Sequence, residues 1–146
     1  MRLVLSLIAI AALPANATAQ SLRPLPELAD NAANAYPPAR CAGFYQAFME
    51  WAGQERLGQE TWQSTDIARQ NAILLSAMIA QRESGGELVD QVENTVRDVR
   101  NIADLYRDRF EQNYAVSGEI LGSDPLILAD LEYCAELADE ISAALQ

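Results

Sequence analysis

Carboxylates are the most numerous groups in this chain that could do chemistry. The sequence holds 21 acidic residues against 10 basic ones, all of them Arg, and its formal charge is −11. Four acids cluster at near-helical spacing close to the C-terminus; they are Glu132, Glu136, Asp139 and Glu140. Such an acidic patch would attract a divalent cation or a basic partner, although a solvated helix face is the simpler interpretation. Because no EF-hand spacing is present, we expect no metal site and no cofactor.

Two residue types that most enzymes use are missing from the sequence, which contains neither His nor Lys. Without them the chain cannot build a Ser-His-Asp or Cys-His arrangement, a His-bearing zinc site or a Lys Schiff base. A hydrolase that uses carboxylates alone remains an alternative, but nothing in the sequence selects one pair of acids. We therefore expect no catalytic residues and no enzymatic activity.

The two cysteines, Cys41 and Cys134, allow only one intramolecular disulfide. In an exported protein an even number of cysteines indicates a structural bridge. A catalytic dithiol usually has Cys-x-x-Cys spacing, which is absent here. We predict a structural Cys41–Cys134 disulfide, with two free buried thiols, or redox or intermolecular use, as the alternatives.

The aromatic residues are concentrated in one quarter of the chain; they are Tyr36, Phe44, Tyr45, Phe48, Trp51 and Trp62. Most are expected in the core, but they outnumber what one packed helix face needs. Exposed aromatic side chains mark binding surfaces. The residues that we predict could contact a partner are Tyr45, Trp51, Trp62 and Tyr114.

Residues 1–19 have the pattern of a cleaved signal peptide. Arg2 precedes an apolar stretch of 11 residues, Leu3–Leu13, and Ala17-Thr18-Ala19 is a small-x-small cleavage signal. An apolar stretch of this length falls short of the ~20 residues that span a bilayer. We expect cleavage after Ala19, no membrane insertion afterwards, and a periplasmic or extracellular location.

The remaining chain reads as a Pro-rich arm (20–38) followed by a helical domain (39–146). Apolar residues recur at helical spacing and predict four helices, at 39–53, 61–83, 87–114 and 125–144. We expect the second helix to be buried on more than one side, with an inward stripe of Ile67, Asn71, Leu74, Leu75 and Met78 that is widened by Ile73, Ala77 and Ala80. The predicted fold is all-α: a small up-down-up-down four-helix bundle whose first and last helices are joined by the disulfide.

These features favour an exported, acidic binding or interaction protein, such as an inhibitor, an immunity factor, an adaptor or a chaperone-like protein. Its partner would be another protein, and a cationic one would be drawn in faster. The negative charge argues against nucleic acid as a partner. A carrier of a small apolar ligand between the helices is the alternative. The chain resembles small exported helical proteins in type, without sharing a motif with them.

Overall fold

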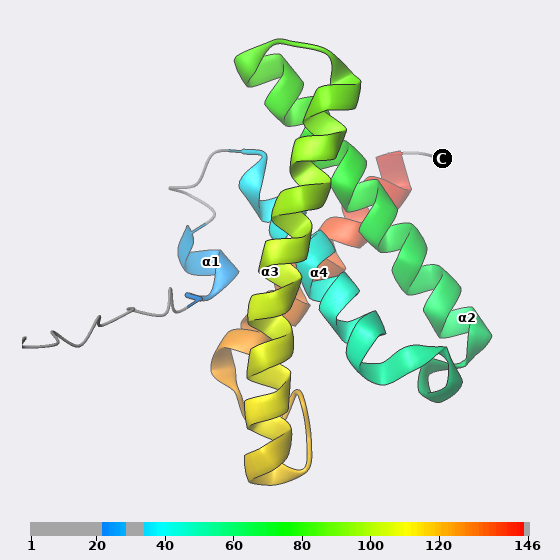
Figure 1. Ribbon diagram of the computed structural model, residues 1–146, viewed down its shortest axis with the longest axis vertical. Coiled ribbons are helices and arrows are strands. Elements are labelled where there is room, and N and C mark those ends of the chain that lie inside the picture. Colours follow the sequence, from blue (N-terminus) through cyan, green and yellow to red (C-terminus); the bar gives the residue numbers. More distant parts are fainter. Residues whose placement is uncertain (1–21, 29–33, 145–146) are drawn as a thin grey trace, which may run out of the picture.

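The computed structural model describes residues 22–28 and 34–144, and every regular element in these ranges is an α-helix (Figure 1). The helices are α1 (Leu25–Leu28), α2 (Tyr36–Ser84), α3 (Leu88–Ser117) and α4 (Pro125–Ala144). The predicted all-α fold is therefore confirmed. The predicted signal peptide lies outside the described residues, and so does part of the predicted arm.

Two glycines divide α2 into two arms. Gly53 and Gly58 have φ values of 70° and 74°, in the region that glycine enters without the steric penalty of a side chain. The first arm (36–52) and the second arm (59–84) correspond to two of the predicted helices. Figure 1 shows the chain reversing direction between the arms, then at α3 and again at α4, which is the expected up-down-up-down order.

The beginning of α2 differs from the predicted boundary. The helix begins at Tyr36, and Pro37 and Pro38 lie buried in its first turn. Proline suits this position because the first amides of a helix have no partner within the helix. These two prolines therefore pack with the helical bundle, although the sequence pattern had placed them in the arm.

The core lies between the two arms of α2, α3 and the first half of α4. Its aromatic centre is Phe44, whose ring meets those of Tyr106 and Phe110 edge to face at centroid distances of 5.2 and 5.9 Å. At Gly43 the first arm of α2 passes so close to α3 that an added Cβ would lie 2.5 Å from Ile102 Cγ2. The same Cβ would lie 3.2 Å from the backbone oxygen of Val99.

Gly43→Ala is expected to destabilise the protein by ~1–3 kcal/mol through overpacking, despite the ~1 kcal/mol that alanine gains over glycine in helix propensity. Urea unfolding followed by circular dichroism measures the change. The substitution should be better tolerated in an Ile102→Ala background, which removes Cγ2 but keeps the Cβ of residue 102, 2.8 Å from the added Cβ. Equal losses in the two backgrounds would show that the contact with Ile102 Cγ2 is not the cause.

The second arm of α2 packs with a different face from the one that the sequence pattern favoured. Its buried residues are Ala72, Ile73, Ser76 and Ala77. The predicted inward residues Ile67, Leu74 and Met78 are 58, 46 and 37% exposed. Small side chains let two helices approach closely, and the alanine-rich face meets α3 for that reason. The prediction was therefore wrong for Ile67, Leu74 and Met78, whereas the burial expected of Ile73 and Ala77 is confirmed. A face of larger apolar side chains is left at the surface.

The predicted disulfide joins the first arm of α2 to α4. Cys41 and Cys134 are both completely buried, and their Cα atoms are 5.3 Å apart. The hydroxyl of Tyr45 donates a hydrogen bond of 2.6 Å to the backbone oxygen of Cys134. The bridge thus anchors α4 at the middle of the bundle, where Leu25 of α1 packs against it.

Asp124 holds the beginning of α4. Its Oδ1 accepts hydrogen bonds from the backbone amides of Leu126 and Ile127, as the side chain of an N-cap residue does. Arg109 of α3 donates to both of its carboxylate oxygens, at 2.6 and 2.8 Å. Burial by itself raises the pKa of Asp124, but the hydrogen bonds from Arg109 and Asn113 outweigh burial and lower the pKa to about 2.

We expect Asp124→Ala to lose ~2 kcal/mol of unfolding free energy at pH 7, from the cap and the buried ion pair. The folded pKa lies below the unfolded value of about 3.9, so the stabilisation is present above pH ~4 and disappears as the pH falls through about 2. Urea unfolding of both proteins at pH 7 and pH 2 measures the difference. Asp104→Ala is the matched control, because Asp104 pairs with Arg107 at the surface and should lose under ~1 kcal/mol. If the difference in unfolding free energy between the natural protein and Asp124→Ala does not shrink at pH 2, the Asp124 carboxylate is not the source of the stabilisation.

Within residues 22–28 and 34–144, no helix has the length and apolar character needed to cross a membrane.

Candidate interaction surface

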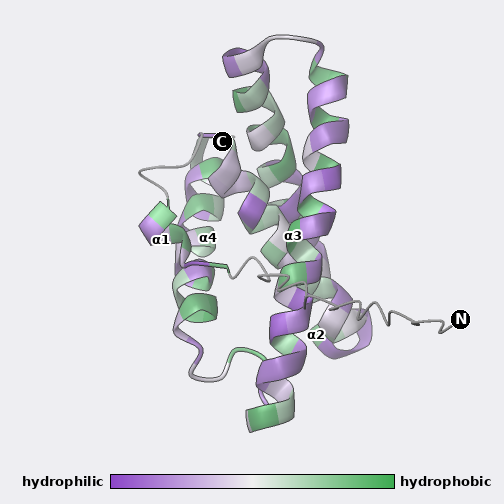
Figure 2. Ribbon diagram, turned by 60° about the vertical axis from the view of Figure 1, so that its left-hand side comes forward, coloured by the Kyte–Doolittle hydropathy of each residue, from purple (hydrophilic) through white to green (hydrophobic). Residues whose placement is uncertain are grey.

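The exposed side chains of Ile67, Leu74 and Met78 form the apolar stripe of α2. Their separations of seven and four residues place them on one face of the second arm. In Figure 2, α3 is largely hydrophilic, whereas the neighbouring stretch of α2 before its last turn is largely apolar. Single exposed apolar residues are common on proteins, whereas three along one helix face form a candidate contact surface.

A groove between α2 and α4 adjoins the apolar stripe. It has a volume of about 270 Å³ and includes Ile67 and Ala68 from α2 together with Ala138 and Ile141 from α4. Asp139 also lines it and brings a carboxylate to its edge. We call this hollow the α2–α4 groove, and together with the stripe it provides an apolar depression next to an acidic helix.

The predicted acidic patch lies on the C-terminal half of α4. Glu132, Glu136, Asp139 and Glu140 are all exposed, and none takes part in the salt bridges that the described residues form. No basic residue lies in the last turn of α4 to offset the negative end of the helix dipole. Nowhere in the described ranges do three or more His, Cys, Asp or Glu residues come together as a metal site would require.

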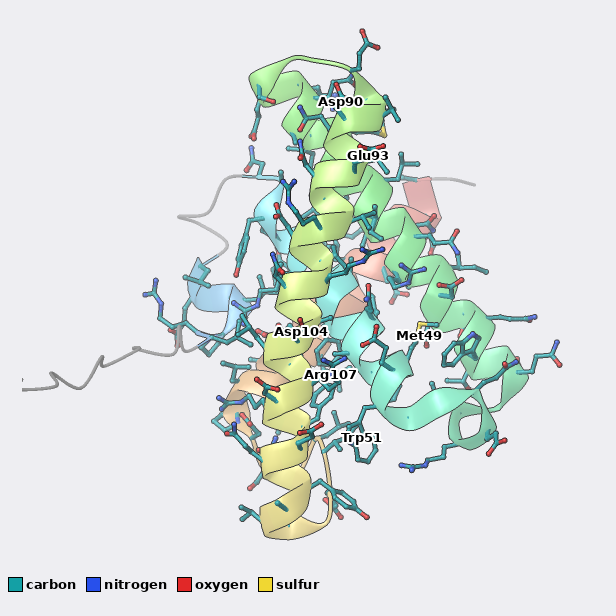
Figure 3. All side chains as sticks on the ribbon, in the orientation of Figure 1. Met49, Trp51, Asp90, Glu93, Asp104 and Arg107 are labelled. Carbon is teal, nitrogen blue, oxygen red and sulfur yellow. A yellow bond between two sulfur atoms is a disulfide. The ribbon has the colours of Figure 1, made fainter. Side chains whose placement is uncertain are left out.

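The structure brings together two of the four predicted aromatic contact residues. The rings of Trp51 and Tyr114 meet edge to face with centroids 5.4 Å apart, and the guanidinium of Arg56 lies 5.2 Å from the centre of the Trp51 ring. Tyr114 is 53% exposed. Figure 3 shows Trp51 at the end of the first arm of α2, beside the C-terminal half of α3. This pair is a second, smaller aromatic surface.

The other two predicted aromatic residues lie elsewhere. Tyr45 is half-buried with its hydroxyl engaged at Cys134, and burial together with the Asp139 carboxylate raises its pKa to about 12. Trp62 is half-buried on the second arm of α2, in a shallow hollow that Arg69 and Arg100 also line. The four residues therefore do not form one continuous surface.

Sequence reasoning missed a buried polar cluster at the centre of the bundle. Asp130 accepts hydrogen bonds of 2.5 Å from Arg40 Nη2 and from the backbone amide of Leu25, and one from the Tyr106 hydroxyl. Arg40 Nε donates to the Tyr106 hydroxyl at 2.8 Å. Burial and the charge of Asp130 raise the pKa of Tyr106 well above 10. A usable signal existed, because Asp130 lies between Ile127 and Cys134 on the inward face of its helix.

This cluster is suited to holding helices together. Asp130 is the only acid fully buried among the described residues, and its partners come from α1, α2 and α3. A general acid–base site needs a carboxyl group that can reach a substrate, and two facing acids in a glycosidase-like case. Asp130 faces Arg40 and Tyr106, and it contributes to no surface groove.

A second hollow, of about 460 Å³, lies between α3 and both arms of α2. Its apolar residues include Ala39, Ala80 and Ile102, but half of its lining is polar. Polar side chains come mainly from one face of α3; they are Gln91, Asn94, Thr95, Asp98 and Asn101. The hollow therefore presents apolar and polar side chains together, and among the described residues it is a place where the carrier alternative could hold a ligand.

Comparisons with protein-family models, with curated proteins and with solved structures found no match to this chain. The functional argument therefore rests on the geometry described above.

Proposed function

We propose that this chain is an exported, acidic helical protein that acts by binding another protein and does not catalyse a reaction. The observation that carries the proposal is the apolar stripe of α2, with Ile67, Leu74 and Met78 exposed along one face of a helix whose opposite face is well packed. Exposing this face to water is unfavourable, and covering it with a partner gains ~25 cal/mol for each Å² of apolar surface removed from water.

The scaffold supports a role in binding. The disulfide and the Arg40–Asp130 pair join the first arm of α2 to α4, so the α4 wall of the groove needs little ordering when a partner binds. Export rests on the signal-like residues 1–19, and a buried disulfide is compatible with an oxidising compartment. The N-terminus of the protein from the exported fraction, read by mass spectrometry, is expected to be Gln20.

Site-specific photo-cross-linking in the producing cells tests the proposal. Benzoylphenylalanine at position 74 is expected to give a reproducible covalent adduct with one protein, which mass spectrometry then identifies. The matched control carries the same group at position 128, because Leu128 of α4 is 44% exposed, close to the 46% of Leu74. No adduct from position 74, or the same adducts from both positions, would reject the α2 face as the contact surface.

A carrier function is the second candidate, and the hollow of about 460 Å³ favours it. If the protein carries a small molecule there, native mass spectrometry of freshly purified protein should show an added mass that disappears on denaturation. Asn94→Trp, which would fill the hollow, should remove that mass. An unmodified mass in the native spectrum would count against a carrier.

A further inference from the structure

We infer that the α2–α4 groove and the apolar stripe of α2 bind a cationic amphipathic helix. The inference deepens the proposed binding function, on which it rests, by naming the chemistry of the partner. An amphipathic helix inserts apolar side chains at helical spacing into a groove of this kind. Two features of the surface select that partner, the shape of its apolar part and the charge along one edge.

The apolar part matches one face of a short helix. From Ile67 to Met78 the stripe extends ~16 Å along α2, which is about three helical turns. The α2–α4 groove opens beside Ile67 and is walled on its other side by Ala138 and Ile141. Large apolar side chains of a partner helix would enter this hollow. The next turns of the partner helix would cover Leu74 and Met78.

The charge at the edge is negative and has no internal counter-charge. Asp139 lines the groove, and α4 has no basic residue along its whole length. Glu136 and Glu140 are exposed on the opposite side of α4 from the residues that line the groove, because successive helical residues advance by about 100°. Lysine or arginine side chains on a partner would therefore meet the Asp139 carboxylate and the negative end of the α4 dipole.

A second copy of the chain fits this surface poorly. Each copy has a formal charge of −11, so two would repel each other. The stripe and groove are also short, whereas a stable dimer interface covers ~800 Å² on each partner. Both arguments favour a small basic helix over self-association.

The test uses a synthetic, fluorescein-labelled peptide of ~14 residues, about four helical turns, with Leu along one face and Lys at the other positions. Two comparison peptides isolate the two features. A scrambled peptide keeps the composition and charge but has no continuous apolar face. An acidic peptide keeps the apolar face and replaces every Lys with Glu. Fluorescence anisotropy with the purified, oxidised protein measures the dissociation constants.

The basic amphipathic peptide is expected to bind at least tenfold more tightly than either comparison peptide, and binding should weaken as salt is added. Leu74→Gln should weaken it roughly tenfold because a buried apolar contact is lost. Leu128→Gln is the matched control and should leave binding unchanged. Asp139→Asn should weaken binding and flatten its salt dependence, whereas Glu136→Gln combined with Glu140→Gln, on the opposite side of α4, should change both less.

Several results would overturn the inference. Equal binding of the scrambled peptide would show simple charge attraction, and equal binding of the acidic peptide would remove the requirement for a cationic partner. Equal effects of Leu74→Gln and Leu128→Gln would place the site elsewhere. A dimer in analytical ultracentrifugation that Leu74→Gln dissociates would assign the face to a second copy. If the peptide fails to bind while cross-linking from position 74 still captures one specific protein, the binding function stands and the cationic helix is rejected.

Discussion

Asp130→Asn is expected to lower the unfolding free energy by ~3–5 kcal/mol, because it leaves the guanidinium of Arg40 buried without a counter-charge. Both side chains of the pair are completely buried, and Arg40 Nη1 already has no hydrogen-bond partner among the described residues. Asparagine keeps the shape of the side chain and can still accept a hydrogen bond from the Leu25 amide. The loss of unfolding free energy therefore reports the effect of removing the charge alone. Urea unfolding at pH 7 with the disulfide intact measures it.

A triple variant provides the control for this prediction. Arg40→Met, Tyr106→Phe and Asp130→Leu together remove every side-chain polar atom of the cluster, and apolar replacements of buried ion pairs are often neutral. We expect this variant to be more stable than Asp130→Asn, although it leaves the amide of Leu25 unpaired, which costs ~1–3 kcal/mol. A triple variant as unstable as Asp130→Asn would show that the hydrogen bonds, and not the buried charge, determine the loss.

Replacing both cysteines with alanine is expected to lower the unfolding free energy by about 4–5 kcal/mol. The bridge joins residues 93 positions apart in sequence, and a loop of that length contributes about this much in the chain-entropy model. Because whole domains are stable by only ~5–15 kcal/mol, we expect a large share of the variant to be unfolded at 37 °C. Guanidinium unfolding followed by circular dichroism measures the change.

Reductant supplies the control for the disulfide prediction. Dithiothreitol should move the unfolding midpoint of the natural protein toward that of the Cys41→Ala/Cys134→Ala variant and leave the variant unchanged. If Cys41 and Cys134 were free thiols, dithiothreitol would not change the unfolding midpoint of the natural protein. A variant within ~1 kcal/mol of the oxidised protein would show that the buried polar cluster, more than the bridge, holds α4 in place.

The helices and the disulfide could be predicted because each has a local signature. The four helices follow from apolar residues at spacings of three and four, and the breaks follow from glycines, as at Gly53 and Gly58. The bridge followed from cysteine number and from the inward position of Cys41 and Cys134 on two predicted helices. Predicted and observed boundaries differ by at most three residues and coincide at 125–144, because capping and tertiary contacts at helix ends decide them.

The candidate site was only partly predictable. The acids of α4 could be read directly from the sequence, because exposed charges need no partner within the fold. The apolar stripe was assigned to the wrong side, because the second arm of α2 is apolar on two faces and periodicity does not rank them. Trp51 and Tyr114 are 63 positions apart in sequence, and no local pattern indicates that their rings meet.

The sequence alone determined the class of fold, the single disulfide and the acidic character of this protein. The fold class depends on residue spacing within a few turns of one helix, where geometry is set by the backbone, while the disulfide and the acidic character follow from the numbers of cysteines and charged residues. Only the tertiary structure decided which face of α2 is buried, and it paired Arg40 with Asp130. Those outcomes depend on how closely neighbouring helices can approach. The alanine-rich face allowed closer packing against α3, and the larger apolar side chains were left at the surface.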